Sequence, residues 1–149
     1  MSNMSTIKPA EILIVEDNAA DIRLTKEALK DSKIYNKIHV VEDGVEAMKF
    51  LKKEGDYKDV PIPDLVILDL NLPKKGGREV LQEIKGDKKL KKIPVVILTV
   101  SEAEEDVLDT YDRHANCYIR KPIDLNQFEK VVKSIEDFWF SIVKLPPKE

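Results

Sequence analysis

The sequence predicts a doubly wound α/β domain, in which helices cover both faces of a parallel sheet. Five short apolar segments alternate with charged segments of helical periodicity, and this alternation is typical of parallel sheets. Three of the apolar segments, Ile12–Val15, Leu65–Leu68 and Val95–Leu98, contain no polar residue. Strands of this composition are usually buried on both faces, which favours a sheet enclosed between two helix layers.

The expected strands end at or beside polar residues. No internal repeat is visible in the sequence. The longest loop runs from Gly55 to Pro63, where Pro61 and Pro63 stiffen the entry to the third strand. In chain order, the strands are expected at Glu11–Glu16, Ile38–Glu42, Leu65–Asp69, Val95–Thr99 and Cys117–Arg120.

Helix start signals lie between these strands. A side chain of Asn, Asp or Ser ahead of an apolar-periodic segment can accept hydrogen bonds from the free N–H groups of a first helical turn. After each such residue, apolar positions recur every three or four residues and so lie on one face of the helix. The expected helices run from Asn18 to about Asp31, from Asp43-Gly44 to near Glu54, through Val80, Leu81 and Ile84, from Ser101 with Glu104, and from Asp124 with Gln127.

The composition limits the classes of function. The chain has 149 residues, and 28 acidic against 25 basic residues give a net charge of −3, so no overall positive field would recruit nucleic acid. No apolar segment approaches the roughly 20 residues that span a bilayer. The N-terminus lacks a signal-peptide pattern, and Cys117 is the only cysteine, which excludes an internal disulfide. We therefore expect a cytoplasmic protein with no nucleic-acid or membrane partner.

Polar residues at the strand ends suggest the chemistry. Glu16 and Asp17 follow the first strand, Asp69 and Thr99 end the third and fourth, and Lys121 follows the fifth. In doubly wound sheets, ligands bind beyond the carboxyl ends of the strands. Three carboxylates at this edge would repel one another unless a cation lay among them. Mg²⁺, or alternatively Mn²⁺, suits such oxygen ligands, and a carboxylate can itself accept a phosphoryl group.

This ordered set of residues resembles the receiver domains of response regulators. The resemblance extends from Glu11 to about Ile135 and implies a flavodoxin-like (CheY-like) (βα)5 fold with a five-stranded parallel sheet of strand order 2-1-3-4-5. It is carried by Glu16-Asp17, Asp69-Leu70-Asn71-Leu72-Pro73, Thr99, Tyr118 and Lys121-Pro122.

The resemblance also implies a role for each residue. Asp69 resembles the phosphoacceptor, while Glu16, Asp17 and the backbone carbonyl of Asn71 resemble the metal ligands, with Asp69 as a shared ligand. Thr99 resembles the switch hydroxyl. Tyr118 resembles the aromatic side chain that moves with the switch. Lys121 resembles the lysine that pairs with the phosphoryl oxygens, and the resemblance implies a cis bond between Lys121 and Pro122.

The implied function is a single-domain response regulator that takes a phosphoryl group from a sensor histidine kinase and then changes conformation. It would not be an enzyme with separate substrate turnover. We expect a tail at 1–10, the receiver domain at 11–137 and an extension at 138–149, with no output domain after it. The extension resembles short response regulators partnered with phytochrome-type histidine kinases, which implies a homodimer through Phe138, Trp139 and Ile142.

Three alternative functions fit this sequence less well. A haloacid-dehalogenase-type phosphatase needs a second Asp two residues after the first, where this chain has Asn71. An FMN carrier needs a hydroxyl- and glycine-rich phosphate loop where this chain has Glu16-Asp17. A degenerate receiver used as a scaffold would have lost a key position. His39 and His114 show no spacing for metal binding or catalysis and are interpreted as structural or surface residues, whereas Cys117 is expected to be a small buried residue on the fifth strand.

Overall fold

A computed structural model describes residues 9–31, 35–99 and 117–120, together with positions 126, 129, 130 and 133. Of Thr99 and of residues 117–120 it describes the backbone only. The helix expected from Ser101 lies outside these ranges. Of the helix expected from Asp124, the four described positions are helical.

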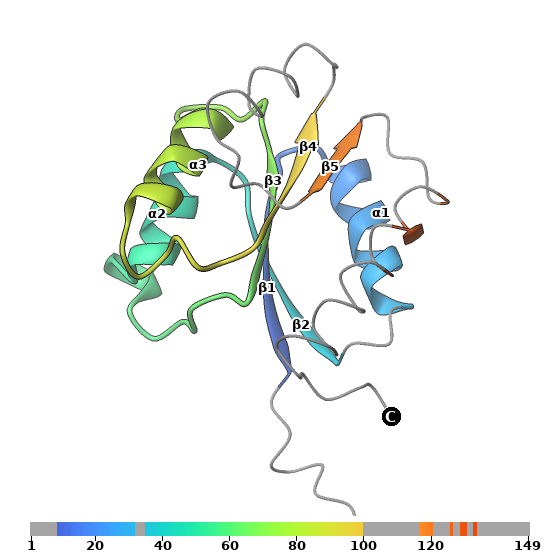
Figure 1. Ribbon diagram of the computed structural model, residues 1–149, viewed down its shortest axis with the longest axis horizontal. Coiled ribbons are helices and arrows are strands. Elements are labelled where there is room, and N and C mark those ends of the chain that lie inside the picture. Colours follow the sequence, from blue (N-terminus) through green and yellow to red (C-terminus); the bar gives the residue numbers. More distant parts are fainter. Residues whose placement is uncertain are drawn as a thin grey trace, which may run out of the picture.

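Five parallel strands form one sheet in the order β2-β1-β3-β4-β5 (Figure 1). This confirms the predicted fold class and strand order. The third, fourth and fifth strands have the predicted bounds, whereas the first two begin earlier and end one residue earlier than expected. Their bounds are β1 Ala10–Val15, β2 Asn36–Val41, β3 Leu65–Asp69, β4 Val95–Thr99 and β5 Cys117–Arg120.

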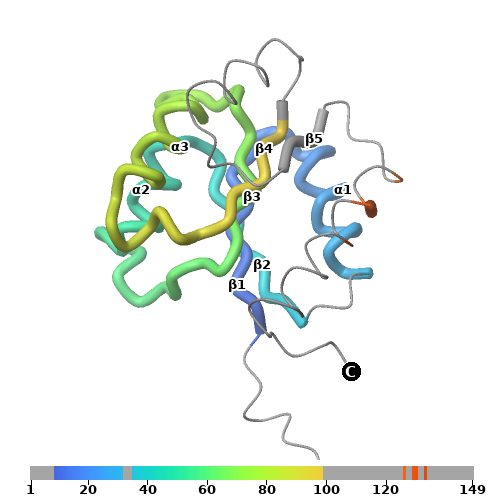
Figure 2. Tube along the Cα trace, in the orientation of Figure 1, coloured from blue at the N-terminus to red at the C-terminus, as the bar shows by residue number. Residues whose placement is uncertain are grey.

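Helices cover both faces of the sheet. α1 (Ala19–Lys30) lies on one face, and α2 (Gly44–Lys52) and α3 (Gly77–Gly86) lie side by side on the other (Figure 2). A short 3₁₀ helix, η2 (Gly55–Tyr57), follows α2 in what was expected to be an irregular loop. Among the described residues, no helix is long and apolar enough to cross a bilayer.

The helix caps predicted at Asn18 and Asp43 are present, whereas those predicted at Ser101 and Asp124 lie outside the described residues. The Asn18 side chain accepts a hydrogen bond from the Asp21 N–H at 3.0 Å, and the Asp43 side chain accepts one from the Glu46 N–H at 2.8 Å. The second helix ends before the expected position near Glu54, because Lys53 adopts a left-handed conformation with φ 57°. A left-handed residue cannot continue an α-helix and commonly terminates one.

Side-chain alternation along the strands divides the core into two clusters. On β1, Ile12 and Ile14 belong to the cluster beneath α1, whereas Leu13 and Val15 pack with α2 and α3. Each such side chain, fully buried, stabilises the fold by about 1.5–3 kcal/mol. The sheet is therefore anchored on both sides, which fixes the positions of its strand ends.

His39 has a structural role, as predicted. Its Nε2 lies 2.9 Å from the Glu11 carboxylate on the neighbouring strand β1, and its ring centroid lies 5.3 Å from that of Phe50 on α2. This contact ties the edge strand β2 to both its neighbour strand and a helix.

Candidate functional site

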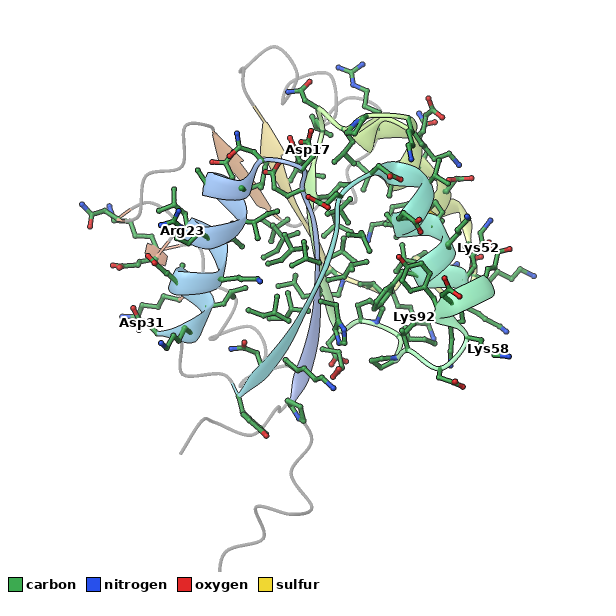
Figure 3. The ribbon with its side chains drawn as sticks, turned by 180° about the vertical axis from the view of Figure 1, so that it is seen from behind. Asp17, Arg23, Asp31, Lys52, Lys58 and Lys92 are labelled. Carbon is green, nitrogen blue, oxygen red and sulfur yellow. The ribbon has the colours of Figure 1, made fainter. Side chains whose placement is uncertain are left out.

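Three carboxylates meet at the carboxyl edge of the sheet. Glu16, Asp17 and Asp69 each place one carboxylate oxygen within 4.8 Å of the others. Asp17 lies in the turn between β1 and α1, at the top of the molecule in Figure 3. The predicted convergence of these residues is therefore present in the structure.

Strand register brings two of these side chains together. β1 pairs with β3 so that Val15 lies opposite Leu68, which places Glu16 beside Asp69. Both residues continue the strand positions that face α1, after Ile14 on β1 and Ile67 on β3. A shift of one residue in either strand would send one carboxylate to the opposite face of the sheet.

The two strand-end carboxylates are buried but supplied with hydrogen bonds. Glu16 is 0% exposed and Asp69 is 1% exposed, whereas Asp17 is exposed. Glu16 Oε2 accepts from the N–H groups of Asp17 at 3.0 Å and Asn18 at 3.1 Å, and Asp69 Oδ1 accepts from the Asn71 N–H at 3.1 Å. These donors orient the carboxylates, and a divalent cation would balance the charge that they concentrate.

The segment after Asp69 packs closely on α3, a feature that our sequence analysis missed. A Cβ atom at Gly77 would overlap the Asp69 carbonyl oxygen and would lie 2.6 Å from Leu70 Cα. The Gly77 N–H donates to the Leu70 carbonyl oxygen at 3.1 Å. Only glycine allows this approach, so Gly77 determines how closely the end of β3 lies to α3. The Gly76-Gly77 pair was the available sequence signal.

The same loop is also held against the start of α2. A Cβ atom at Gly44 would overlap the Lys75 carbonyl oxygen, and Lys74, with a left-handed φ of 65°, places Nζ 3.5 Å from Asp43 Oδ2. Lys75 Nζ also forms a 2.7 Å ion pair with Glu83 on α3. The loop that contains Asn71 is thus braced by both neighbouring helices. Sequence reasoning did not find these contacts.

The other predicted site residues are described only in part. Asp69 lies opposite Leu98, so the Thr99 backbone lies one position beyond it on β4, at the same sheet edge. The Tyr118 backbone lies opposite Ile97. The side chains of Thr99 and Tyr118 lie outside the described part of the chain, as do Lys121, Pro122, Phe138, Trp139 and Ile142.

The arrangement combines a cation site with a nucleophile. Carboxylate oxygens from two adjacent strand ends form a hard, anionic ligand set of the kind that Mg²⁺ or Mn²⁺ binds. Asp69 is both a member of this set and a potential nucleophile toward phosphorus. A cation bound at this site would lie beside any phosphoryl group that Asp69 attacks.

Known proteins are similar to this chain in sequence and fold. The family model for the response regulator receiver domain matches residues 12–133. The response regulator Rcp1 of Synechocystis sp. is 51% identical over 138 residues, covering 93% of this chain and 94% of Rcp1.

Two solved structures are similar along almost the whole chain. The phosphorylated cyanobacterial phytochrome response regulator RcpA is 50% identical, with a TM-score of 0.78, covering 95% of this chain and 100% of that one. The Mn²⁺-bound form of Rcp1 is 51% identical, with a TM-score of 0.78, covering 93% and 99% of the two chains.

Proposed function

The chain belongs to the response regulator receiver domain family, and we propose that it accepts a phosphoryl group on Asp69 from a sensor histidine kinase. The convergence of Glu16, Asp17 and Asp69 within 4.8 Å is the observation that carries the proposal. Family membership also decides against the phosphatase and FMN-carrier alternatives. The intact acidic set disfavours the degenerate scaffold.

A divalent cation fits the proposed site. Glu16, Asp17 and Asp69 would hold Mg²⁺ or Mn²⁺, with the Asn71 carbonyl oxygen as a further ligand. The ligands support this assignment because all three are hard carboxylate oxygens at one end of the sheet, two of them on the buried residues Glu16 and Asp69. The Mn²⁺-bound structure of the similar Rcp1 supports it as well. When bound, the cation supplies positive charge to the phosphoryl oxygens.

Asp69 performs the bond-forming step in this proposal. One of its carboxylate oxygens attacks the phosphorus of a phosphohistidine, an O–P bond forms, and the P–N bond breaks with its electron pair returning to the imidazole nitrogen. The Asn71 N–H, which donates to Asp69 Oδ1, keeps the carboxylate oriented. Lys121 pairs with the phosphoryl oxygens and Thr99 donates its hydroxyl to them. Positioning and charge neutralisation are the main requirements of this chemistry.

Phosphorylation then shifts a conformational equilibrium. The Thr99 side chain turns toward the phosphoryl group, and the Tyr118 side chain on β5 moves into the space that Thr99 has left. Differential contacts in the two states allow one covalent change to alter a protein-binding face. The chain acts as a signalling protein whose only chemistry is its own phosphorylation and dephosphorylation, and it operates in the cytoplasm without nucleic-acid or membrane partners.

We assign the upstream kinase to the phytochrome type. The similarity to RcpA, a phytochrome response regulator, supports this assignment. Purified phytochrome-type and unrelated sensor kinases, each labelled on histidine, provide the test. Faster loss of label from the phytochrome-type kinase to this chain is expected, and equal rates would contradict the assignment.

The extension at 138–149 is proposed to form a homodimer beyond the receiver domain at 11–137. Phe138, Trp139 and Ile142 repeat at helical spacing and are more apolar than a small domain needs. Replacing Phe138 and Trp139 by Ser should halve the mass measured by light scattering. An unchanged mass would remove the proposal without affecting the phosphoacceptor assignment.

Mass spectrometry tests the phosphoacceptor directly. Incubation with Mg²⁺ and acetyl phosphate should add one base-labile phosphoryl group, and EDTA should prevent the addition. Asp69→Asn should remain unmodified, whereas Asp59→Asn, at an exposed position in the loop after η2, should behave as the unchanged protein. A modification that persists in Asp69→Asn would overturn the proposed function.

A further inference from the structure

The amino-terminal ends of the strands form the edge of the sheet opposite the carboxylates, and the surface there is different. It is formed by the end of α2, the loop before β3 and the loop after α3, because the helices run antiparallel to the strands. A cavity of about 270 Å³ lies there, lined by Leu51, Lys52, Lys53, Ile62, Asp87, Lys89 and Leu90. None of these residues belongs to the phosphoacceptor site.

The cavity has an apolar interior and a basic rim. Leu51 and Leu90 are each 3% exposed and form its buried wall, whereas Ile62 is 50% exposed at its opening. Most drug-sized ligands occupy pockets of roughly 300–1,000 Å³. A smaller cavity that presents an exposed isoleucine is better matched to one inserted aliphatic or aromatic side chain.

Hydrogen bonds hold the loop after α3 in place. Lys85 Nζ donates to the carbonyl oxygens of Lys91 at 3.2 Å and Ile93 at 2.8 Å. Asp87 Oδ1 accepts from the N–H groups of Lys89 at 2.7 Å and Leu90 at 3.2 Å. The cavity wall is therefore preformed, which lowers the entropy lost when a partner binds.

The lining of the cavity is net basic, with Lys52, Lys53 and Lys89 against Asp87, although the whole chain is acidic. Among the described residues that line it, Asp87 is the only acidic one, and its carboxylate already accepts hydrogen bonds from backbone N–H groups. Figure 3 shows Lys52, Lys58 and Lys92 on the same flank of the molecule. The exposed lysines of the rim and its surroundings are Lys52, Lys53, Lys58, Lys88, Lys89, Lys91 and Lys92, and they outnumber the exposed acidic residues of the same segments, Glu54, Asp56 and Asp59.

We propose that this edge binds an acidic peptide segment of a partner protein, with one apolar side chain of that segment inserted into the cavity. The lysines attract the acidic residues on approach and the apolar interior retains the anchor. A nucleic acid would satisfy the lysines but has no aliphatic side chain to fill the cavity. The interaction does not depend on the phosphorylation state of Asp69.

Fluorescence anisotropy with designed peptides tests the proposal on the full chain. The probe is a labelled peptide of glutamate and aspartate with one central leucine, and the reference peptide has glycine in place of that leucine. The leucine peptide should bind at least tenfold more tightly. Equal affinities would show that charge alone drives binding and would overturn the proposal.

Substitutions locate the site. Ile62→Ser should remove the preference for the leucine peptide, and Lys52→Glu with Lys89→Glu should weaken both peptides at least tenfold. Matched controls are Val45→Ser, at another exposed apolar residue, and Lys26→Glu, at an exposed lysine on α1. Both controls should bind as the unchanged chain does, and circular dichroism should report the same fold for all variants.

Other anions define the remaining outcomes. Single-stranded oligothymidylate and phosphatidylserine vesicles are each tested as competitors of the labelled leucine peptide. If either displaces it at a lower concentration than the unlabelled leucine peptide does, the proposal is overturned in favour of a nucleic acid or a membrane. Binding of the leucine peptide that persists unchanged in Ile62→Ser would also overturn it. Asp69→Asn should bind the peptide normally, so failure here is distinguishable from failure of the phosphoacceptor assignment.

Discussion

The two edges of the sheet carry opposite charge in different physical settings. At the carboxyl edge, buried Glu16 and Asp69 lie with Asp17 in one acidic cluster that depends on backbone donors. At the other edge, the lysines are exposed around an apolar cavity. Exposed charges are solvated individually, whereas clustered buried ones require fixed partners. The acidic edge should therefore be the more sensitive of the two to small changes in structure.

Helix α3 joins the two edges, and its terminal glycines test this difference most strongly. Gly77→Ala should lower the free energy of unfolding by about 3 kcal/mol, because the new Cβ would overlap the backbone of Asp69 and Leu70. Gly86→Ala meets open space at the opposite edge and should raise it by up to about 1 kcal/mol. Urea unfolding measures both, and equal effects would contradict the comparison.

Metal affinity should depend on acidic residues of one edge only. Asp17→Asn should weaken Mg²⁺ binding by more than about tenfold, since loss of a direct ligand exceeds the effect of losing an outer partner. Isothermal titration calorimetry provides the measurement. Asp87→Asn, at the lysine-rich edge, should leave the affinity unchanged, and a loss of affinity there would place the cation elsewhere.

Removing the Asp17 charge should stabilise the metal-free protein, although it weakens metal binding. Without a cation, the three carboxylates repel one another, so Asp17→Asn should raise the melting temperature in EDTA. In saturating Mg²⁺ the order should reverse, because bound ligand stabilises the unchanged chain by about 2.7 kcal/mol at one hundred times its dissociation constant. A variant that is less stable in EDTA would argue against repulsion at this edge.

The helix cap at the acidic edge should contribute to stability without affecting the metal. Asn18→Ala should cost about 1 kcal/mol, because the Asp21 N–H loses its acceptor. Asn18→Ser keeps an acceptor and should restore most of the loss. Mg²⁺ affinity should stay the same in both variants, since the backbone N–H of residue 18 still donates to Glu16.

The smallest expected effect concerns Tyr57, near the end of α2. Burial, a hydrogen bond with Glu46 and the charges of Glu46, Asp43 and Asp56 raise the pKa of Tyr57 above its ordinary value of 10.0. The folded state then holds the phenol proton more tightly than the unfolded state. The resulting contribution of Tyr57 to the free energy of unfolding is therefore present below pH 10 and is lost as the pH rises further. Tyr57→Phe should show a shallower loss of stability above pH 10 than the unchanged chain.

Continuous apolar segments made the sheet predictable from sequence. β3 is buried along its whole length, and so are Val95–Leu98 of β4, so their continuous apolar segments located both strands. β1 and β2 ended one residue early, since Glu16 and Glu42 are polar and pattern alone did not separate strand from turn. Asn18 and Asp43 were found as caps because capping depends on local chemistry.

The braced loop could not be predicted in the same way. Gly44 and Lys75 are far apart in sequence, and their contact depends on how α2 and the loop after β3 pack in three dimensions. The cavity around Ile62 likewise depends on three segments that meet only in the folded chain. Strand-end chemistry was predictable since topology fixes which ends lie together, whereas contacts between loops and helices are set by tertiary packing.

Fluorine NMR with beryllofluoride tests the central claim most directly, namely that Glu16, Asp17 and Asp69 form a cation-dependent phosphoryl site. Beryllofluoride imitates a phosphoryl group on a carboxylate. The account predicts bound fluorine resonances in the presence of Mg²⁺, their loss on adding EDTA, and their absence from Asp69→Asn. Bound resonances that persist in EDTA or in Asp69→Asn, or no bound signal with Mg²⁺ present, would contradict it.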